Sequence, residues 1–118
     1  IWSPLASGIL TGKYNEGIPE GRKRKKIGIV KKLQAYAKEK FDTSIAALAI
    51  AWCLKNKNVS TVLLGATSVQ QITENLKALD VARKITKTHL AEIEEIVKNK
   101  PKQDGDWGRN LEVTIETD

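Results

Sequence analysis

The sequence predicts an α/β fold made of two consecutive β/α units and a closing helix. Two short apolar segments, residues 1–3 and 59–66, have the composition of buried strands, and each leads into small residues and a helix start. At 118 residues, the chain has less than half of the roughly 250 residues of a closed α/β barrel. We therefore expect an incomplete barrel, with open sheet edges and apolar faces that further strands would cover.

The first strand is expected to end at a turn. Pro4 fixes its own backbone φ and Gly8 permits a left-handed φ, so "SPLASG" favours a tight turn. A short helical turn should follow over residues 9–13. The segment "NEGIPEG", residues 15–21, has the composition of a loop.

Two helices are expected before the second strand. In residues 22–40 a helical period places four side chains on one face, namely Ile29, Leu33, Tyr36 and Ala37. The next helix, "SIAALAIAWCLKNK", can be capped by Asp42, Thr43 or Ser44. It is apolar nearly all round, so we expect it to be covered on most sides.

Two more helices should follow the second strand. The first would be capped by Thr67 or Ser68 and would bury a stripe of Val69, Ile72, Leu76 and Leu79. The second would be capped by Thr86 and would bury Leu90, Ile93 and Val97. The polar residues 102–118 are expected to form an exposed tail, although "LEVTI" could pair as an edge strand.

Composition excludes several classes of protein. The chain is 41% hydrophobic and 29% charged, and it lacks an apolar run of the roughly 20 residues that a transmembrane helix needs. Its single cysteine, Cys53, cannot form an internal disulfide, which favours a reducing compartment. One histidine and one cysteine far apart do not make a metal site. We expect Cys53 to be a core residue and His89 to be a capping or surface residue. The sequence therefore shows no pair of side chains suited to acid–base catalysis.

The positive charge is concentrated in one segment. The net charge is +6, but residues 22–32 carry seven basic side chains and no acidic one, which leaves −1 for the rest. Such a run could bind nucleic acid. Single-strand binders need interleaved aromatic residues, and this segment has none. We therefore expect a solvated helix start or loop and no nucleic-acid partner.

Both predicted strands end in an arrangement that suits an anion. Each gives way to small residues and then a helix N-terminus, which offers free N–H groups and a positive dipole end. Hydroxyl and ammonium donors accompany these loops, namely Ser3, Ser7, Thr67, Ser68 and Lys13. These residues could form a phosphate site, or they could be ordinary turn and helix-cap residues. Gln71, Glu74 and Asn75 share one face of the following helix, which could either read a nucleotide base or be solvated.

Three stretches resemble a known family. "WSPLASGILTGKY", "LAIAWCLKNKNVSTVLLGATS" and "ENLKAL" are similar to the C-terminal part of the aldo-keto reductases, with most similarity to the β subunits of voltage-gated potassium channels. The resemblance covers residues 1–101. It implies the C-terminal portion of a (β/α)8 TIM barrel, comprising the last two β/α units and the C-terminal helix, with residues 102–118 as a tail.

The resemblance also implies a cofactor, NADP(H), and a role for each matching residue. The nicotinamide and pyrophosphate would lie along Trp2, Ser3, Pro4, Leu5, Ala6 and Ser7. A further phosphate contact would come from Lys13. The adenosine ribose and its 2′-phosphate would contact Gly65 and Thr67. The adenine would be held by Gln71, Glu74 and Asn75.

The expected function follows from the same resemblance. In the family the catalytic Asp, Tyr, Lys and His lie on earlier strands, and none of the four is matched here, so we expect this chain alone to be inactive. The segment between "GIP" and "KKLQAYAKE" is also shorter than in the family. The resemblance implies a cytoplasmic regulatory subunit that docks as a homotetramer on a potassium channel α subunit, and whose full-length form reduces aldehydes or ketones. The alternative is part of a general NADPH-dependent aldo-keto reductase without a channel role.

Overall fold

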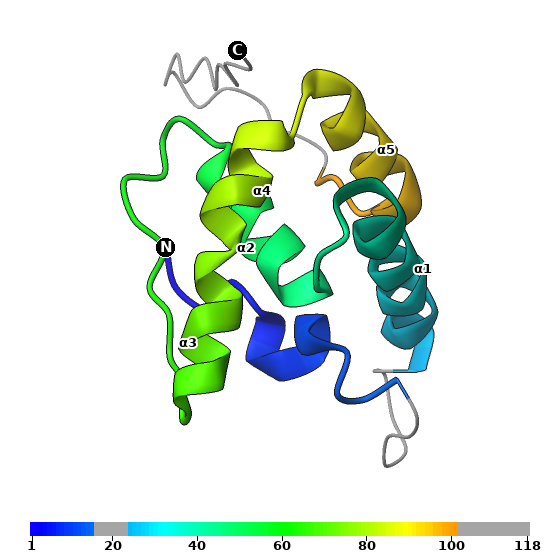
Figure 1. The fold of residues 1–118 in the computed structure, drawn as a ribbon. Coiled ribbons are helices and arrows are strands. Elements are labelled where there is room, and N and C mark those ends of the chain that lie inside the picture. The colour runs from blue at the N-terminus through cyan, green and yellow to red at the C-terminus, as the bar shows by residue number, and fades with distance from the viewer. Residues whose placement is uncertain (16–23, 102–118) are drawn as a thin grey trace, which may run out of the picture.

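All regular structure in the described part of the chain is helical. The computed structural model describes residues 1–15 and 24–101, so the expected tail and the start of the basic segment lie outside the described residues. Figure 1 shows the helices arranged around a central one, α2. The elements are a 3-10 helix η1 (Ala6–Thr11), then α1 (Arg24–Phe41), α2 (Ile45–Leu54), α3 (Val69–Leu76), α4 (Ala78–Lys84) and α5 (Lys87–Val97).

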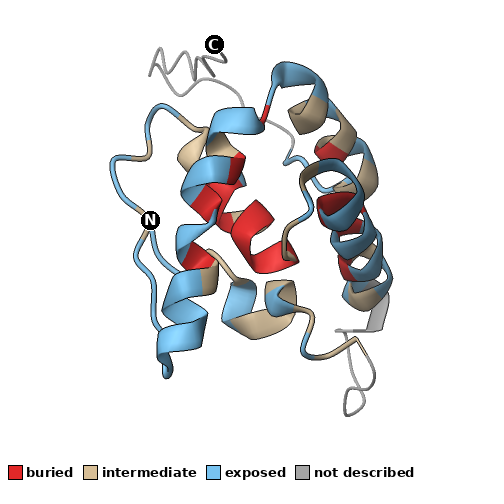
Figure 2. Ribbon diagram, in the orientation of Figure 1, coloured by how far each residue is buried: buried red, intermediate tan, exposed pale blue. Residues whose placement is uncertain are grey.

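The centre of the core is α2, as its sequence predicts. The hydroxyl of Ser44 accepts a hydrogen bond from the Ala47 N–H at 3.2 Å, which caps the helix and selects Ser44 from the three candidates. Seven of its ten residues are buried, namely Ile45, Ala46, Ala47, Leu48, Ile50, Ala51 and Cys53. Figure 2 shows this concentration of buried residues between α1 on one side and α4 on the other. The expectation that neighbours cover α2 on most sides is confirmed.

The predicted apolar stripe of α1 is confirmed at three of its four positions. Leu33, Tyr36 and Ala37 are buried, whereas Ile29 is half-buried. The hydroxyl of Tyr36 donates a hydrogen bond to the Glu92 carboxylate, which joins α1 to α5. Burial raises the pKa of Tyr36, and the hydrogen bond to Glu92 raises it further by a smaller amount.

The closing helix begins where the sequence predicts. Thr86 caps α5 by accepting from the His89 N–H at 3.4 Å, and the His89 ring accepts in return from the Thr86 N–H at 3.1 Å. The same ring packs edge-on against Phe41 of α1, with centroids 4.8 Å apart. His89 therefore has the structural role expected of it. Of the expected stripe, Ile93 is buried while Leu90 and Val97 are half-buried.

The prediction of two regular strands is wrong. Residues 1–3 and 59–66 are extended segments without strand assignment. They nevertheless lie side by side, because the backbone nitrogen of Ile1 donates to the Thr61 carbonyl and the Leu63 N–H donates to the Ile1 carbonyl, both at 2.9 Å. This is the bonding pattern of a parallel pair. It extends over a single residue because the described residues supply no further strand, and an isolated pair of strands is only marginally stable.

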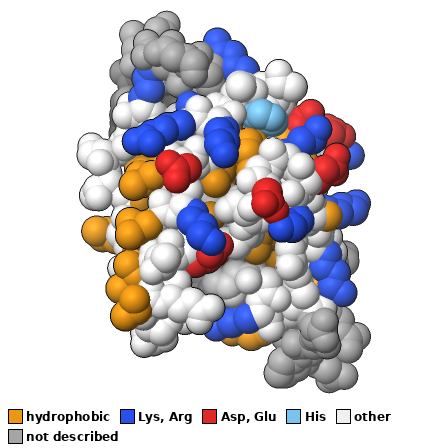
Figure 3. Space-filling view, in the orientation of Figure 1, with side chains coloured by type: hydrophobic (Ala, Val, Ile, Leu, Met, Phe, Trp, Pro, Cys, Tyr) orange, Lys and Arg blue, Asp and Glu red, His pale blue; other side chains and the backbone are white. Residues whose placement is uncertain are grey.

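The predicted buried stripe after the second segment is also wrong. The residues Val69, Ile72, Leu76 and Leu79 are 79%, 51%, 56% and 53% exposed. The expected single helix is divided at Lys77, and α3 and α4 turn a different face toward α2, formed by Asn75, Ala78, Val81 and Ile85. The small side chain of Ala78 lets the backbones of α4 and α2 approach closely. Residues 1–15 and 24–101 form no sheet on which the stripe could pack. Figure 3 shows hydrophobic side chains gathered on the left-hand side, where α3 lies.

Close packing around α2 predicts different tolerance of two alanines. Ala51 is fully buried, whereas Ala49 is half-buried and lines a cavity. We expect Ala51→Leu to lower the free energy of unfolding by about 1–3 kcal/mol through overpacking. Ala49→Leu adds the same volume where space exists and should cost much less. Urea denaturation followed by circular dichroism measures both, and equal losses would contradict this packing.

The orientation of α3 and α4 gives a second prediction. Ile85 is 1% exposed and Leu79 is 53% exposed. Ile85→Ala should therefore lower the free energy of unfolding by about 2–5 kcal/mol. Leu79→Ala should change it by less than about 0.5 kcal/mol, as surface substitutions usually do. If thermal and urea denaturation gave the reverse order, the buried face would be the one that the sequence pattern predicts.

Candidate functional site

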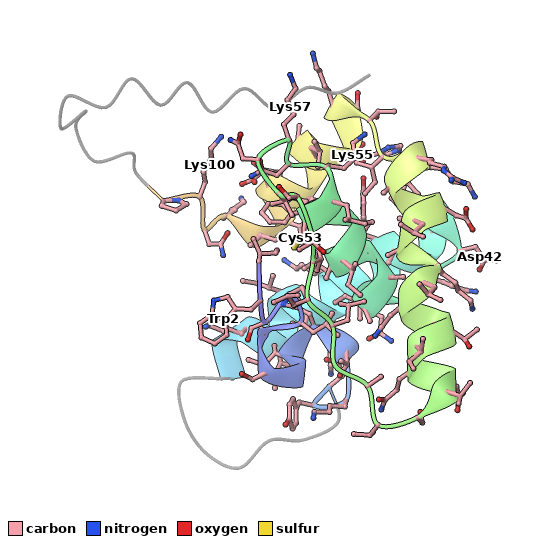
Figure 4. The ribbon with its side chains drawn as sticks, turned by 90° about the vertical axis from the view of Figure 1, so that its left-hand side faces the viewer. Trp2, Asp42, Cys53, Lys55, Lys57 and Lys100 are labelled. Atoms are coloured by element: carbon pink, nitrogen blue, oxygen red, sulfur yellow. The ribbon has the colours of Figure 1, made fainter. Side chains whose placement is uncertain are left out.

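The first candidate loop has an unusual backbone. Ser3, Ala6 and Ser7 adopt left-handed φ values of 54°, 48° and 56°, although none of them is glycine. Each such residue costs roughly 1–2 kcal/mol. The turn is held by two hydrogen bonds, from the Ala6 N–H to the Ser3 carbonyl at 3.1 Å and from the Gly8 N–H to the Leu5 carbonyl at 3.0 Å. The side chain of Trp2 is 81% exposed and projects outward in Figure 4.

Lys13 lies against this loop. A Cβ atom placed on Gly8 would come within 2.8 Å of the Lys13 Nζ, and the φ of Gly8 is +85°. The positive φ disfavours a side chain at Gly8, whereas the flexible end of the Lys13 side chain can move aside. The same Nζ lies 4.9 Å from the centre of the Tyr14 ring, a cation–π distance. The structure therefore brings an ammonium group to the loop, as the phosphate hypothesis requires.

The second candidate loop leads into α3. Ser68, rather than Thr67, is the cap, because its hydroxyl accepts from the Gln71 N–H at 3.3 Å. The side-chain oxygen of Gln71 accepts in turn from the Thr67 N–H at 2.8 Å and from the Thr67 hydroxyl at 3.2 Å. Gln71 thus holds the loop in shape. Gly65 and Thr67 are exposed at the surface.

The other two residues of the polar face point toward the core helix. Glu74 forms an ion pair with Lys77 at 2.7 Å. The hydrogen bond to Lys77, with a smaller contribution from Ser44 at the start of α2, holds the pKa of Glu74 below its usual value. Asn75 is 8% exposed and is the one buried polar side chain of the described residues. In this structure these two residues support the contact between α3 and α2.

The parallel contact at Ile1 positions both loops. Because Ile1 bonds to Thr61 and Leu63, the segment that enters the first loop runs beside the segment that enters the second, in the same direction. Both loops therefore start from the same end of this pair, as Figure 1 allows the reader to follow. The contact joins Ile1 to Thr61, 60 positions further along the chain, and each of these residues comes shortly before one group of predicted residues.

An apolar cavity of about 390 Å³ adjoins the first loop. Of the predicted site residues, Pro4 and Ala6 line it, and none from the second loop does. The other walls come from η1, α1, α2, α5 and the residue Asn99. Cys53 also lines the cavity, and burial raises the pKa of its thiol, as expected of a core cysteine. The sequence pattern did not reveal this cavity, because its walls come from separate elements.

Residues 1–15 and 24–101 contain no group of three or more His, Cys, Asp or Glu side chains that could hold a metal ion. Within the same ranges, no helix has the length and hydropathy needed to cross a bilayer. Tyr36 is paired with Glu92 and has a raised pKa, which makes it a poor proton donor.

Two relatives resemble this chain over most of its length. One, from Arabidopsis thaliana, is named "Probable voltage-gated potassium channel subunit beta" and is 40% identical over 117 residues, covering 86% of this chain and 36% of the relative. The other, from Schizosaccharomyces pombe, has a similar provisional name for the same type of subunit and is 40% identical over 118 residues, covering 86% of this chain and 34% of the relative. The chain spans about a third of the length of these relatives.

The family assignment comes from a broader comparison. The model of the aldo/keto reductase family matches residues 1–98, which include both candidate loops and all the described helices. The resemblance inferred from the three sequence stretches is thereby confirmed. The chain belongs to the aldo/keto reductase family.

Proposed function

We propose that this chain is the NADP(H)-binding C-terminal part of an aldo/keto reductase related to potassium channel β subunits. The observation that carries the proposal is the parallel contact of Ile1 with Thr61 and Leu63, which sets the two candidate loops at one end of a paired segment. In α/β folds, dinucleotides bind at the loops that follow the carboxyl ends of parallel strands. Family membership supports the same choice of cofactor.

The residues present suit such a cofactor. The Lys13 ammonium beside the first loop would bind a phosphate group, and the exposed Gly65 and Thr67 would contact the ribose and its 2′-phosphate. Gln71, which holds the second loop, would lie next to the adenine. For Glu74 and Asn75 to contact adenine, the α3–α2 contact has to loosen. When bound, the reduced cofactor would supply a hydride. The residues of this chain would hold the cofactor in place.

The exposed apolar surface supports an incomplete barrel. The stripe of Val69, Ile72, Leu76 and Leu79 is exposed to water, and Leu63 is 61% exposed as well. Patches of this kind mark surfaces that another structural element covers. We propose that in a longer protein these side chains pack on the strands of a (β/α)8 barrel. The aldehyde or ketone reductase activity proposed for that protein would then use catalytic residues from its other strands.

The names of the two relatives favour a channel role for the proposed binding module. In this proposal the protein is cytoplasmic, assembles as a homotetramer and docks on the α subunit of a voltage-gated potassium channel. The alternative is a general NADPH-dependent reductase with no channel partner. The two proposals share the cofactor and differ in the partner, so a partner-binding experiment separates them.

The proposed 2′-phosphate contacts predict a preference between cofactors. Isothermal titration of the chain should show tighter binding of NADPH than of NADH. Lys13→Ala and Thr67→Val should each weaken NADPH binding by about tenfold or more, the loss expected for one contact to a charged group. Lys40→Ala, an exposed lysine of α1, is the matched control. Equal affinities for the two cofactors, or failure to bind NADPH, would contradict the proposed site.

The channel role predicts binding to a protein partner. The chain, immobilised for surface plasmon resonance, should bind the purified cytoplasmic domain of a voltage-gated potassium channel α subunit. The control is an unrelated domain with the same net charge as the channel domain. It measures how much binding comes only from attraction to or repulsion from the chain's charge of +6. Binding of NADPH without binding of the channel domain would favour the general reductase.

A further inference from the structure

A second hollow, distinct from the candidate cofactor loops, lies where α2 ends and α5 begins. Its volume is about 380 Å³, and it is lined by Trp52, Lys55, Asn56, Lys87, Leu90, Ala91, Glu94 and Lys100. None of the residues assigned to NADP(H) lines it. Trp52 and Glu94 also line the apolar cavity, so the two hollows share a wall.

Three lysines from three different segments meet at this hollow. Lys55 caps the C-terminus of α2, Lys87 is the first residue of α5, and Lys100 follows α5. Figure 4 shows Lys55 and Lys100 at the same end of the molecule, above Cys53. Among the ion pairs of the described residues, none involves any of these three lysines.

The positive charge of the hollow is poorly compensated. Glu94 is the one acidic side chain that lines it, against three ammonium groups. Lys87 also stands at the positive end of the α5 dipole, and the first turn of α5 has no acidic residue to offset it. A cation at this position is unfavourable for the helix unless an anion lies nearby. The hollow therefore favours a ligand with more than one negative charge.

The remaining walls favour a flat ring. Trp52 is 44% exposed and offers an aromatic surface to the hollow. Lys55, which caps α2, lies about one helical turn after Trp52. Leu90 and Ala91 of α5 add apolar surface, and the Asn56 amide offers both a hydrogen-bond donor and an acceptor. An aromatic platform bordered by several cations matches a base attached to a phosphate chain.

We propose that this hollow binds a nucleoside diphosphate, with the base against Trp52 and the phosphates among Lys55, Lys87 and Lys100. A diphosphate carries close to three negative charges near neutral pH, which matches three ammonium groups better than a single phosphate does. The site goes beyond the proposed cofactor function, because it uses none of the cofactor residues. Binding there would link a second ligand to the end of α2 and to the apolar cavity behind Trp52.

The test is an isothermal titration of the whole chain with ADP, adenosine and pyrophosphate. ADP should bind at least tenfold more tightly than either of its parts. The double variant Lys55→Ala/Lys87→Ala should lose at least tenfold in ADP affinity. Lys31→Ala/Lys40→Ala removes the same charge from exposed positions on α1 and should lose less than twofold. Far-UV circular dichroism checks that both double variants stay folded.

NMR separates this site from the cofactor loops. Added ADP should shift the amide resonances of Trp52, Lys55 and Leu90, which line the hollow. Shifts at Thr67 without shifts at these three residues would place the ligand at the cofactor loops and overturn the proposal. Equal losses in the two lysine double variants, or no ADP binding by the original chain, would also overturn it. Pyrophosphate that binds as tightly as ADP would refute the role of Trp52.

Discussion

The rest of the structure depends on the need to keep α2 out of water. Seven of its ten residues are buried, and its apolar side chains point in all directions, so no single neighbour can cover it. Consequently four elements pack on α2, namely α1, η1, α3 and α4. The small residues Ala47 and Ala51, both fully buried, permit this close approach. Burial of α2 thus decides which faces of its neighbours turn inward.

Covering α2 has a consequence for the other apolar surfaces. With α3 and α4 turned so that Ala78, Val81 and Ile85 contact the core, the stripe from Val69 to Leu79 is left facing water. The extended segments keep a single parallel contact at Ile1. The same contact arranges the candidate loops, so the proposed cofactor site rests on a very small number of hydrogen bonds, and on the strained backbone from Ala6 to Gly8.

Local signals in the sequence predict the helices and their caps well, because a cap or a helical period involves residues close in the chain. Ser44, Ser68 and Thr86 are examples. Strand pairing and the choice of buried face depend on distant neighbours, which is why the strands and the stripe of α3 were predicted wrongly. For the candidate site, the sequence predicts Lys13 and the loops, but it does not show that Asn75 turns inward. The hollow at Trp52 was missed because its lysines come from separate segments.

We propose that the contact at Ile1 joins two distant loops into one cofactor site. Amide hydrogen exchange, measured residue by residue by NMR with and without NADPH, tests it most directly. The Leu63 amide, bonded to the Ile1 carbonyl, should be protected without cofactor. NADPH should slow exchange at Ala6, Gly8 and Thr67 together. Slower exchange in only one loop, or an unprotected Leu63 amide, would contradict the claim.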